Sequence, residues 1–347
     1  MTYQLIAPLI FLGVPILVMS LLNKREPLAS SLRYAKPLNG DKVGYPEDIF
    51  PGGDYVSIPN GSTKYWLFGP EDGKKIVLVH GISIPAAIYK LVGHELAKNG
   101  FRVLTYDLFG RGYSDAPKVP NDEALFVNQL FMLLHKIGWT HNVNIVGLSM
   151  GGGIAASFAQ HFPDMVDRIA LLAPAGLMAD SEVPLLGKLV KSSLVNSTLL
   201  ILNGISAVKN YIEDAILSRV RKELTPGFLA VGEGEDMAQV SELMRLLSEI
   251  MLYQLRYHTG YLRSFFSSVC HFPLVGLEDA YAALGKIPRV PVLAIWGDKD
   301  QTVPYSGAEK LTSRIKHAQL ITLPEAGHII VVTHPETVTR HLVEFFS

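Results

Sequence analysis

Three side chains in this sequence, a serine, an aspartate and a histidine, have the surroundings that nucleophilic catalysis requires. Ser149 lies in GLSMG, residues 147–151, between a β-branched apolar run and a helix-forming run. A serine hydroxyl is a weak nucleophile at neutral pH, so it needs a base, and the base needs an acid to orient it. We therefore ask whether Ser149 is a reactive centre or a tightly packed corner, and where its partners would lie.

The two glycines of GLSMG have a physical reason in a turn from a strand to a helix. Val143–Val146 is typical of a short buried strand, and the residues from Met150 onward have helical spacing. In such a strained turn, side chains at 147 and 151 would collide with a neighbouring strand and helix. The pattern predicts a serine Oγ held out at the carboxyl edge of a sheet.

The acid and the histidine are expected to follow the serine in that order. Asp300 lies in IWGDKDQTVP, directly beyond a predicted strand over 290–296, and His328 lies in LPEAGHII, beyond a predicted strand over 318–323. Both follow the carboxyl end of a parallel strand, where open α/β sheets collect their sites. The alternative for His328 is a loop histidine bonded to backbone.

Two other aspartates could supply the acid. Asp298 is two residues nearer the strand and could cap the turn instead, and Asp107 follows an earlier strand. We favour Asp300 because its greater reach past the strand lets its carboxylate face a later loop. The Gly110-Arg111-Gly112 loop after Asp107 is interpreted as structural, with the glycines forming the turn and Arg111 paired.

Charge developing on a substrate carbonyl oxygen needs preorganised donors, typically backbone N–H groups. Met150, at the start of the helix after Ser149, is expected to supply one N–H. Ile82, in the loop HGIS after a predicted strand ending at His80, is expected to supply the other. We expect His80 to shape this turn; a catalytic role for it is the alternative.

Composition limits the classes of function. The chain has 347 residues, of which 48% are hydrophobic, and a net charge of −1. This charge argues against a nucleic-acid partner. The one cysteine, Cys270, excludes an intrachain disulfide, and no Cys and His cluster has the spacing of a zinc site. We expect neither a metal nor an organic cofactor.

Strand and helix patterns alternate along most of the chain. A hairpin is predicted over 54–68. Further strands are expected at 74–80, 101–107, 142–147, 168–174, 290–298 and 318–323, and helices at 85–99, 121–137, 150–162, 306–316 and 334–346. This alternation indicates a parallel sheet covered on both faces. The alternation stops at about residue 176 and resumes near 287, so residues 177–286 are predicted to be a helical insertion.

The N-terminus differs from the rest. Residues 3–22 carry no charge and as a helix would span about 30 Å, the thickness of a bilayer's hydrocarbon core. We predict a single-pass membrane anchor over 1–23, with Lys24 and Arg25 placing the catalytic domain in the cytosol. The alternatives are an unusual signal sequence or an apolar tail on the membrane surface, and two glycosylation triplets, at Asn60 and Asn196, oppose the cytosolic orientation.

These patterns divide the chain into five parts. The anchor, 1–23, precedes a linker, 24–53, that is expected to lie over the domain surface. The catalytic core is expected in two pieces, 54–176 and 287–347, on either side of the 177–286 insertion. Within the insertion, residues 183–210 could dip into a membrane surface or pack on the core. Residues 251–269 could line an acyl pocket or bury their aromatic side chains.

The motifs HGIS, DLFGRGYSD, GLSMGGG, WGDKD and GHIIVVTHP occur in the order of the α/β-hydrolase superfamily, which the chain resembles over 54–175 and 287–346. The resemblance implies an eight-stranded, mostly parallel sheet with a helical cap inserted after the sixth strand. Ser149 argues against the epoxide hydrolases and dehalogenases of this fold, which use an aspartate. Among the serine enzymes, the chain looks most like membrane-anchored monoacylglycerol lipase-like esterases.

The leading hypothesis is a serine hydrolase acting on carboxylic esters, with a lipid or small-molecule ester as substrate. An acyltransferase or thioesterase could use the same acyl-enzyme, and a carbon–carbon bond hydrolase could use the same triad. A catalytically inactive, membrane-tethered binding module is the non-enzymatic alternative. The sequence predicts neither the acyl-chain length nor an oligomeric state.

Overall fold

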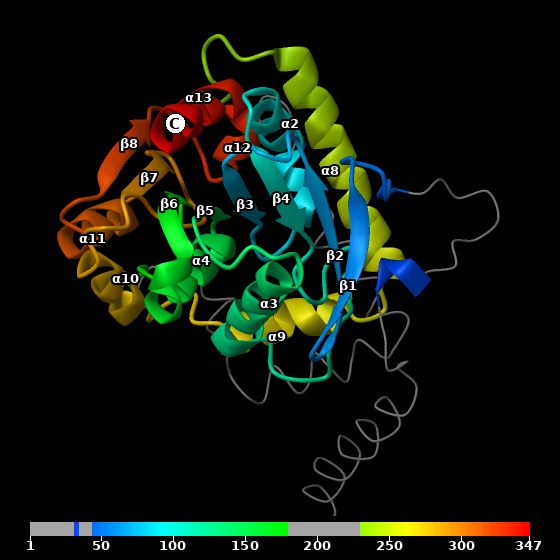
Figure 1. Ribbon diagram of the computed structural model, residues 1–347. Helices are drawn as coiled ribbons and strands as arrows, with labels where there is room; N and C mark the ends of the chain where they lie inside the picture. Colours follow the sequence, from blue (N-terminus) through cyan, green and yellow to red (C-terminus); the bar gives the residue numbers. More distant parts are fainter. Residues whose placement is uncertain (1–30, 35–43, 180–229) are drawn as a thin grey trace, which may run out of the picture.

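The computed structural model describes residues 31–34, 44–179 and 230–347, and its centre is one eight-stranded sheet (Figure 1). The strands are β1 Gly53–Ile58, β2 Gly61–Phe68, β3 Lys75–Val79, β4 Arg102–Tyr106, β5 Val143–Leu148, β6 Val166–Leu172, β7 Val292–Gly297 and β8 Gln319–Leu323. Their order in space is β1-β2-β4-β3-β5-β6-β7-β8. The pairs β1–β2 and β2–β4 are antiparallel, and all other neighbours are parallel. The predicted α/β-hydrolase sheet is therefore confirmed.

Helices cover both faces of this sheet. The described helices are α2 Lys90–Lys98, α3 Glu123–Lys136, α4 Met150–His161, α8 Met237–Tyr257, α9 Tyr261–His271, α10 Glu278–Gly285, α11 Ser306–Arg314, α12 Ile330–Thr333 and α13 Pro335–Phe346. Short 3₁₀ helices occur at η1 Leu32–Tyr34, η2 Ala86–Tyr89 and η3 Pro163–Met165. The predicted helices of the core are all found, most of them a few residues shorter than expected.

Two hydrophobic cores lie on opposite sides of the sheet because successive strand residues point to opposite faces. In β3, Val77 and Val79 join the core under α3, α4, α10 and α11, whereas Ile76 and Leu78 join the core under α2, α8, α12 and α13. Every residue of β5 is buried. A strand buried on both faces holds its carboxyl end rigidly, and Ser149 follows this strand directly.

The described part of the predicted insertion contains α8, α9 and α10, and within that part no residue belongs to a strand of the sheet. Leu247 and Ile250 of α8 are fully buried in the core shared with α2, and Tyr281 of α10 is buried in the core shared with α4. Residues 183–210 lie outside the described part, so the expectation of membrane contact there stays a prediction.

The end of the predicted linker packs into the molecule. Tyr45, Ile49 and Phe50 are 0%, 7% and 1% exposed, and Phe50 stacks on Phe68 of β2 with ring centroids 5.3 Å apart. The expectation that this segment lies over the domain surface is wrong for these residues. Three apolar side chains within six residues supply enough burial to fix the chain here.

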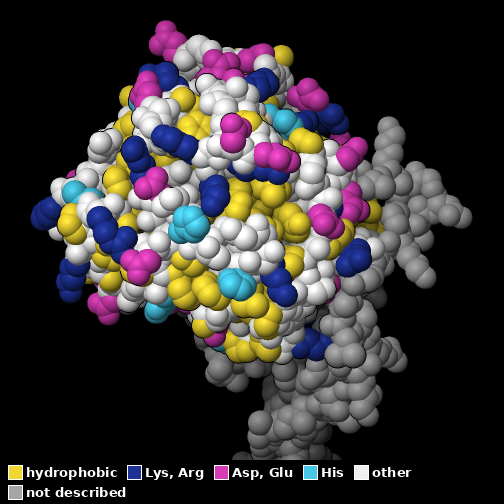
Figure 2. Space-filling model, in the orientation of Figure 1, with side chains coloured by type: hydrophobic (Ala, Val, Ile, Leu, Met, Phe, Trp, Pro, Cys, Tyr) yellow, Lys and Arg dark blue, Asp and Glu magenta, His cyan; other side chains and the backbone are white. Residues whose placement is uncertain are grey.

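The predicted anchor, residues 1–23, lies outside the described residues. In the part of the chain that the structure describes, no helix combines the length and the apolar character needed to span a bilayer. On the face shown in Figure 2, acidic and basic side chains are interspersed, as expected for a chain with a net charge of −1.

Candidate active site

Ser149 occupies the turn between β5 and α4. Its backbone has φ 56° and ψ −121°, outside the regions that non-glycine residues ordinarily adopt. Bonds on both sides hold this strained conformation, since Ser149 N–H donates to Leu172 O at 2.9 Å and Ser149 O accepts from Ala175 N–H at 2.9 Å. Strain of this kind persists only where the surroundings impose it, and it is often found at functional sites.

The glycines on either side of Ser149 are required by close backbone approach. A Cβ at Gly147 would lie 2.3 Å from the carbonyl oxygen of Gly151, and a Cβ at Gly151 would lie 2.1 Å from Val79 O of β3. Both distances are shorter than any real contact of a Cβ. The predicted collisions with a neighbouring helix and strand are therefore confirmed.

Asp300 and His328 are joined by a hydrogen bond at the carboxyl ends of β7 and β8. His328 Nδ1 lies 2.7 Å from Asp300 Oδ2, and the other carboxylate oxygen accepts the N–H groups of Thr302 and Val303, both at 2.8 Å. The Asp300 side chain is fully buried, whereas 15% of the His328 side chain is exposed. Because an ionised carboxylate only accepts, the pair assigns the proton to Nδ1 and leaves Nε2 as a potential base.

Asp298, the first rival for the acid role, faces a different partner. Its carboxylate lies 3.8 Å from the Lys299 ammonium, and its N–H donates to Leu323 O at 3.1 Å. Of the aspartates considered, Asp300 is the one that contacts His328.

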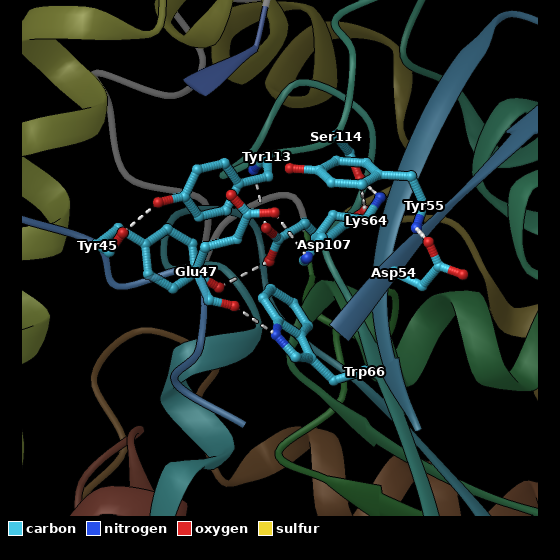
Figure 3. Close-up of polar contacts among 9 residues, drawn as sticks. All are labelled: Tyr45, Glu47, Asp54, Tyr55, Lys64, Trp66, Asp107, Tyr113 and Ser114. Atoms are coloured by element: carbon cyan, nitrogen blue, oxygen red, sulfur yellow. Dashed lines mark hydrogen bonds and ion pairs between the residues drawn. The ribbon is translucent and has the colours of Figure 1, made fainter. Parts of the chain in front are cut away.

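Asp107, the second rival, lies in a separate buried network (Figure 3). Its Oδ1 accepts from the Tyr45 hydroxyl at 3.1 Å and from Ala86 N–H at 3.0 Å, and its Oδ2 accepts from Tyr113 N–H at 2.9 Å. Burial raises the pKa of Asp107 to about 7, against the opposing effect of these donors. Asp107 thus joins the segment after β3 to the loop after β4, a structural role.

His80 has both ring nitrogens engaged. Nδ1 lies 2.7 Å from Gly81 O, and Nε2 accepts from Leu108 N–H at 2.9 Å. Burial lowers the pKa of His80 to about 3, so the ring is neutral at physiological pH. These contacts fit the expected role in shaping the turn after β3.

The two expected oxyanion donors belong to segments that adjoin Ser149. Met150 is the first residue of α4, where N–H groups have no acceptor within the helix. The loop bearing Ile82 approaches Ser149, since a Cβ at Gly81 would lie 3.8 Å from Ser149 Oγ. The site residues thus come from the ends of β3, β5, β7 and β8. Across the described ranges, no hydrogen bond joins Ser149 Oγ to His328, so the structure pairs two of the three expected catalytic side chains.

The sequence indicates only a structural role for Arg111 in its own loop, and it does not predict the contacts by which Arg111 and Tyr261 fix the loop after β3. Arg111 donates to Ile82 O, and Tyr261 donates to Ser83 O, at 2.9 and 3.1 Å. No signal in the sequence could have identified Tyr261, because it lies 178 residues from its partner. Within the residues that the structure describes, no group of three His, Cys, Asp or Glu side chains could hold a metal ion.

Several known proteins resemble this chain in sequence or in fold. A family model described as serine aminopeptidase, S33, matches residues 70–334. The protein Rv2715 of Mycobacterium tuberculosis is 37% identical, but over only 32% of each chain. Monoacylglycerol lipase ABHD6 of Mus musculus is 24% identical over 80% of this chain and 77% of its own. The crystal structure of an enol-lactonase from Burkholderia xenovorans has a TM-score of 0.65 at 20% identity, covering 84% of this chain and 99% of its own, and shows the shared fold.

Proposed function

Because the chain belongs to the serine aminopeptidase S33 family of α/β-hydrolases, we propose that it is a carboxylic ester hydrolase that cleaves lipid-like esters, acylglycerols among them, through an acyl-enzyme on Ser149. The observation that carries the assignment of residues is the 2.7 Å contact between His328 and Asp300, on the same sheet edge as the strained Ser149. An imidazole oriented by a carboxylate, at the same edge of the sheet as a serine in a strained turn, is what acyl transfer requires.

In this mechanism, Ser149 Oγ attacks the ester carbonyl carbon while His328 Nε2 takes the hydroxyl proton. The carbonyl oxygen becomes an oxyanion that accepts from the N–H groups of Ile82 and Met150. The carbon–oxygen ester bond then breaks, and His328 gives its proton to the leaving alkoxide. Asp300 stays ionised and stabilises the imidazolium.

Water completes the cycle. His328 Nε2 removes a proton from a water molecule as its oxygen attacks the acyl carbon, forming a second oxyanion in the same donor pair. The bond to Ser149 Oγ then breaks, and the proton returns to the serine. The products are a carboxylic acid and an alcohol, and the enzyme is restored.

The lipid-like substrate class is supported by the mouse relative, which is named a monoacylglycerol lipase. The uncharged stretch over residues 3–22 supports the further proposal that the chain is anchored in a membrane. Lys24 and Arg25 directly after it support a cytosolic catalytic domain. An enzyme held at a bilayer would meet acylglycerols at high local concentration.

The proposal is tested by labelling the purified full chain with a fluorophosphonate probe and measuring hydrolysis of monoacylglycerols of graded chain length. Wild type should label and hydrolyse, whereas Ser149→Ala should not label. Ser149→Ala and His328→Ala should each lower kcat/KM by several orders of magnitude. Absence of labelling in folded wild type would instead support the binding module.

The acid is tested in the same assay with a matched pair. Asp300→Asn should lower kcat about 10³- to 10⁴-fold because an amide neither fixes the tautomer nor stabilises the imidazolium. Asp298→Asn, two residues away and paired with Lys299, should stay within about threefold of wild type. The reverse pattern would move the acid role to Asp298.

Substrate panels separate the remaining enzymatic alternatives. Ester transfer to an added alcohol that outcompetes hydrolysis would favour an acyltransferase, and faster cleavage of a thioester would favour a thioesterase. Turnover of a diketone would favour carbon–carbon bond hydrolysis. Preferred cleavage of an aminoacyl anilide would favour the peptidase activity that the family description names.

A further inference from the structure

Arg111 is a buried cation beside the loop that bears the expected oxyanion donor Ile82. Its side chain is fully buried, and its guanidinium donates to Ile82 O at 2.9 Å, Phe109 O at 3.0 Å and Ser268 Oγ at 2.9 Å. Its carbon Cζ also lies 5.7 Å from the centre of the Phe126 ring. All three nitrogens of the guanidinium are therefore engaged by neutral groups.

Burying a charge among neutral groups is unfavourable unless they are well-aimed dipoles. Burial lowers the pKa of Arg111 to about 10, which still leaves the side chain charged at neutral pH. A charged donor also makes a stronger hydrogen bond than a neutral one. The Ile82 carbonyl is thus held more firmly than an ordinary loop carbonyl.

The next carbonyl of the same loop is held by the inserted helices. Ser83 O accepts from the Tyr261 hydroxyl of α9 at 3.1 Å and lies 3.4 Å from Gln254 Nε2 of α8. The Gln254 side chain also accepts Gly112 N–H at 2.7 Å, directly after Arg111. The carbonyls of Ile82 and Ser83 are therefore both fixed. Tyr261 and Gln254, which hold Ser83 O, belong to α9 and α8, and Arg111, which holds Ile82 O, is bonded to α9.

We propose that Arg111 is a positioning residue for the oxyanion donor, which keeps the Ile82 N–H directed at the substrate oxygen and makes this alignment depend on α9 through Ser268. The inference rests on the proposed function, because it presupposes that a substrate bonded to Ser149 carries an oxyanion. Fixing the Ile82 carbonyl restricts the rotation of this residue, and a donor displaced by about 1 Å can cost about 100-fold in rate.

The decisive comparison is Arg111→Met against Arg263→Met. Arg263 of α9 also bridges to the loop after β4, donating to Pro117 O at 2.8 Å and Ala116 O at 2.9 Å, and neither of these acceptors belongs to residues 81–83. Arg111→Met should lower kcat about 10- to 100-fold with KM changed less than about threefold. Arg263→Met should keep kcat within about threefold of wild type.

Two inhibitors distinguish positioning from a purely structural role. A trifluoromethyl ketone with the substrate's acyl chain forms an adduct with Ser149 that carries an oxyanion, whereas the corresponding ether has no electrophilic carbon. Arg111→Met should weaken the ketone by about the same factor as kcat/KM and leave the ether's inhibition constant unchanged. Equal weakening of both inhibitors would overturn the proposal.

Conservative variants keep the test decisive if Arg111→Met does not fold. Arg111→Lys retains the charge and can reach one carbonyl, so its kcat should lie between those of Arg111→Met and wild type. Tyr261→Phe removes only the hydroxyl bonded to Ser83 and should lower kcat several-fold, again with a selective loss of the ketone. Wild-type kcat in Arg111→Lys and Tyr261→Phe would contradict the proposal.

Failure of the inference differs from failure of the proposed function. If wild type hydrolyses esters and labels at Ser149 while both arginine variants retain its kcat, only the role of Arg111 is wrong. If wild type neither labels nor hydrolyses any ester, the proposed function itself is wrong.

Discussion

Two buried aspartates, Asp107 and Asp300, show how surroundings separate a structural carboxylate from a candidate catalytic one. Asp300 directs one oxygen at the partly exposed His328, whereas both oxygens of Asp107 accept from groups within the fold. His328, the titratable partner of Asp300, is partly exposed and can therefore meet a substrate, whereas Tyr45, the titratable partner of Asp107, is buried. The other carboxylate has consequences for stability instead.

Asp107 should make the stability of the protein depend on pH. Its pKa is raised from 3.8 to about 7 by burial, so the folded state binds the proton more tightly than the unfolded state. The stabilisation that this proton gives to the folded state is fully present below about pH 4 and is lost as the pH rises through about 7. Between pH 5 and pH 8 the free energy of unfolding should fall by about 2 to 3 kcal/mol relative to a variant without this carboxylate.

Urea unfolding of wild type and Asp107→Asn at both pH values measures this difference, because the other titratable groups contribute equally to both proteins. The free energy of unfolding of wild type, minus that of Asp107→Asn, should be smaller at pH 8 than at pH 5. A difference that stays constant between the two pH values would show that Asp107 remains ionised in the fold.

The sequence identified the candidate catalytic side chains because each follows a strand at a predictable point. Asp300 and His328 come three and five residues after the ends of β7 and β8, so a topological rule predicted that they lie at the same edge of the sheet. The contacts of Arg111 could not be predicted in this way. One of its acceptors, Ser268, lies 157 residues further along the chain, and only the packing of α9 against the loop after β4 brings them together.

At the scale of elements, the junction of β5, α4 and β3 tolerates no added atom at Gly151. A Cβ there would meet the backbone oxygen of Val79 at 2.1 Å, and neither backbone segment can move without disturbing the sheet. Gly151→Ala should therefore destabilise the fold by about 3 kcal/mol or more and abolish ester hydrolysis.

Gly153→Ala on the same helix is the matched control. Its nearest obstacle is Leu277 Cδ1 at 2.8 Å, the end of a side chain that can rotate. This variant should lose less than about 1.5 kcal/mol and retain activity. Thermal unfolding and hydrolysis assays compare the two, and equal losses would show that the strand–helix contact is less rigid than the distances indicate.

Element boundaries were predicted less well than element types. The helix α12, Ile330–Thr333, was not expected, because a run of Ile, Val, Val and Thr has low helix propensity. Its four residues are buried among other helices, and this packing outweighs the local preference. Strand β6 begins at Val166 rather than Arg168, because Val166 pairs with Val143 in the parallel ladder.

At the scale of the whole molecule, the N-terminal region contains the proposed anchor and, after it, residues that belong to the core. Residues 3–22 are apolar enough to enter a bilayer, whereas Tyr45, Ile49 and Phe50 are buried in the catalytic core. If residues 3–22 form the proposed anchor, its boundary with the catalytic domain lies before residue 31, because Leu32 is also buried in the core. Removing the proposed anchor alone and removing the buried residues as well should therefore give different results.

A chain that begins at Lys24 should fold with wild-type stability and hydrolyse a water-soluble short-chain ester with unchanged kcat/KM. It should no longer sediment with phosphatidylcholine vesicles, and its hydrolysis of acylglycerol in those vesicles should fall at least tenfold because the enzyme is no longer concentrated at the surface. Replacing residues 3–22 by an unrelated apolar helix of the same length should restore both properties. Vesicle binding by the Lys24 chain equal to that of the full chain would show that another part of the molecule holds it at the membrane.

A chain that begins at Asp54 should behave differently because it loses buried side chains. Besides Tyr45, Ile49 and Phe50 it lacks Leu32, which is 4% exposed and whose N–H donates to Gly112 O at 3.0 Å. This chain should unfold at lower urea, by several kcal/mol in the free energy of unfolding.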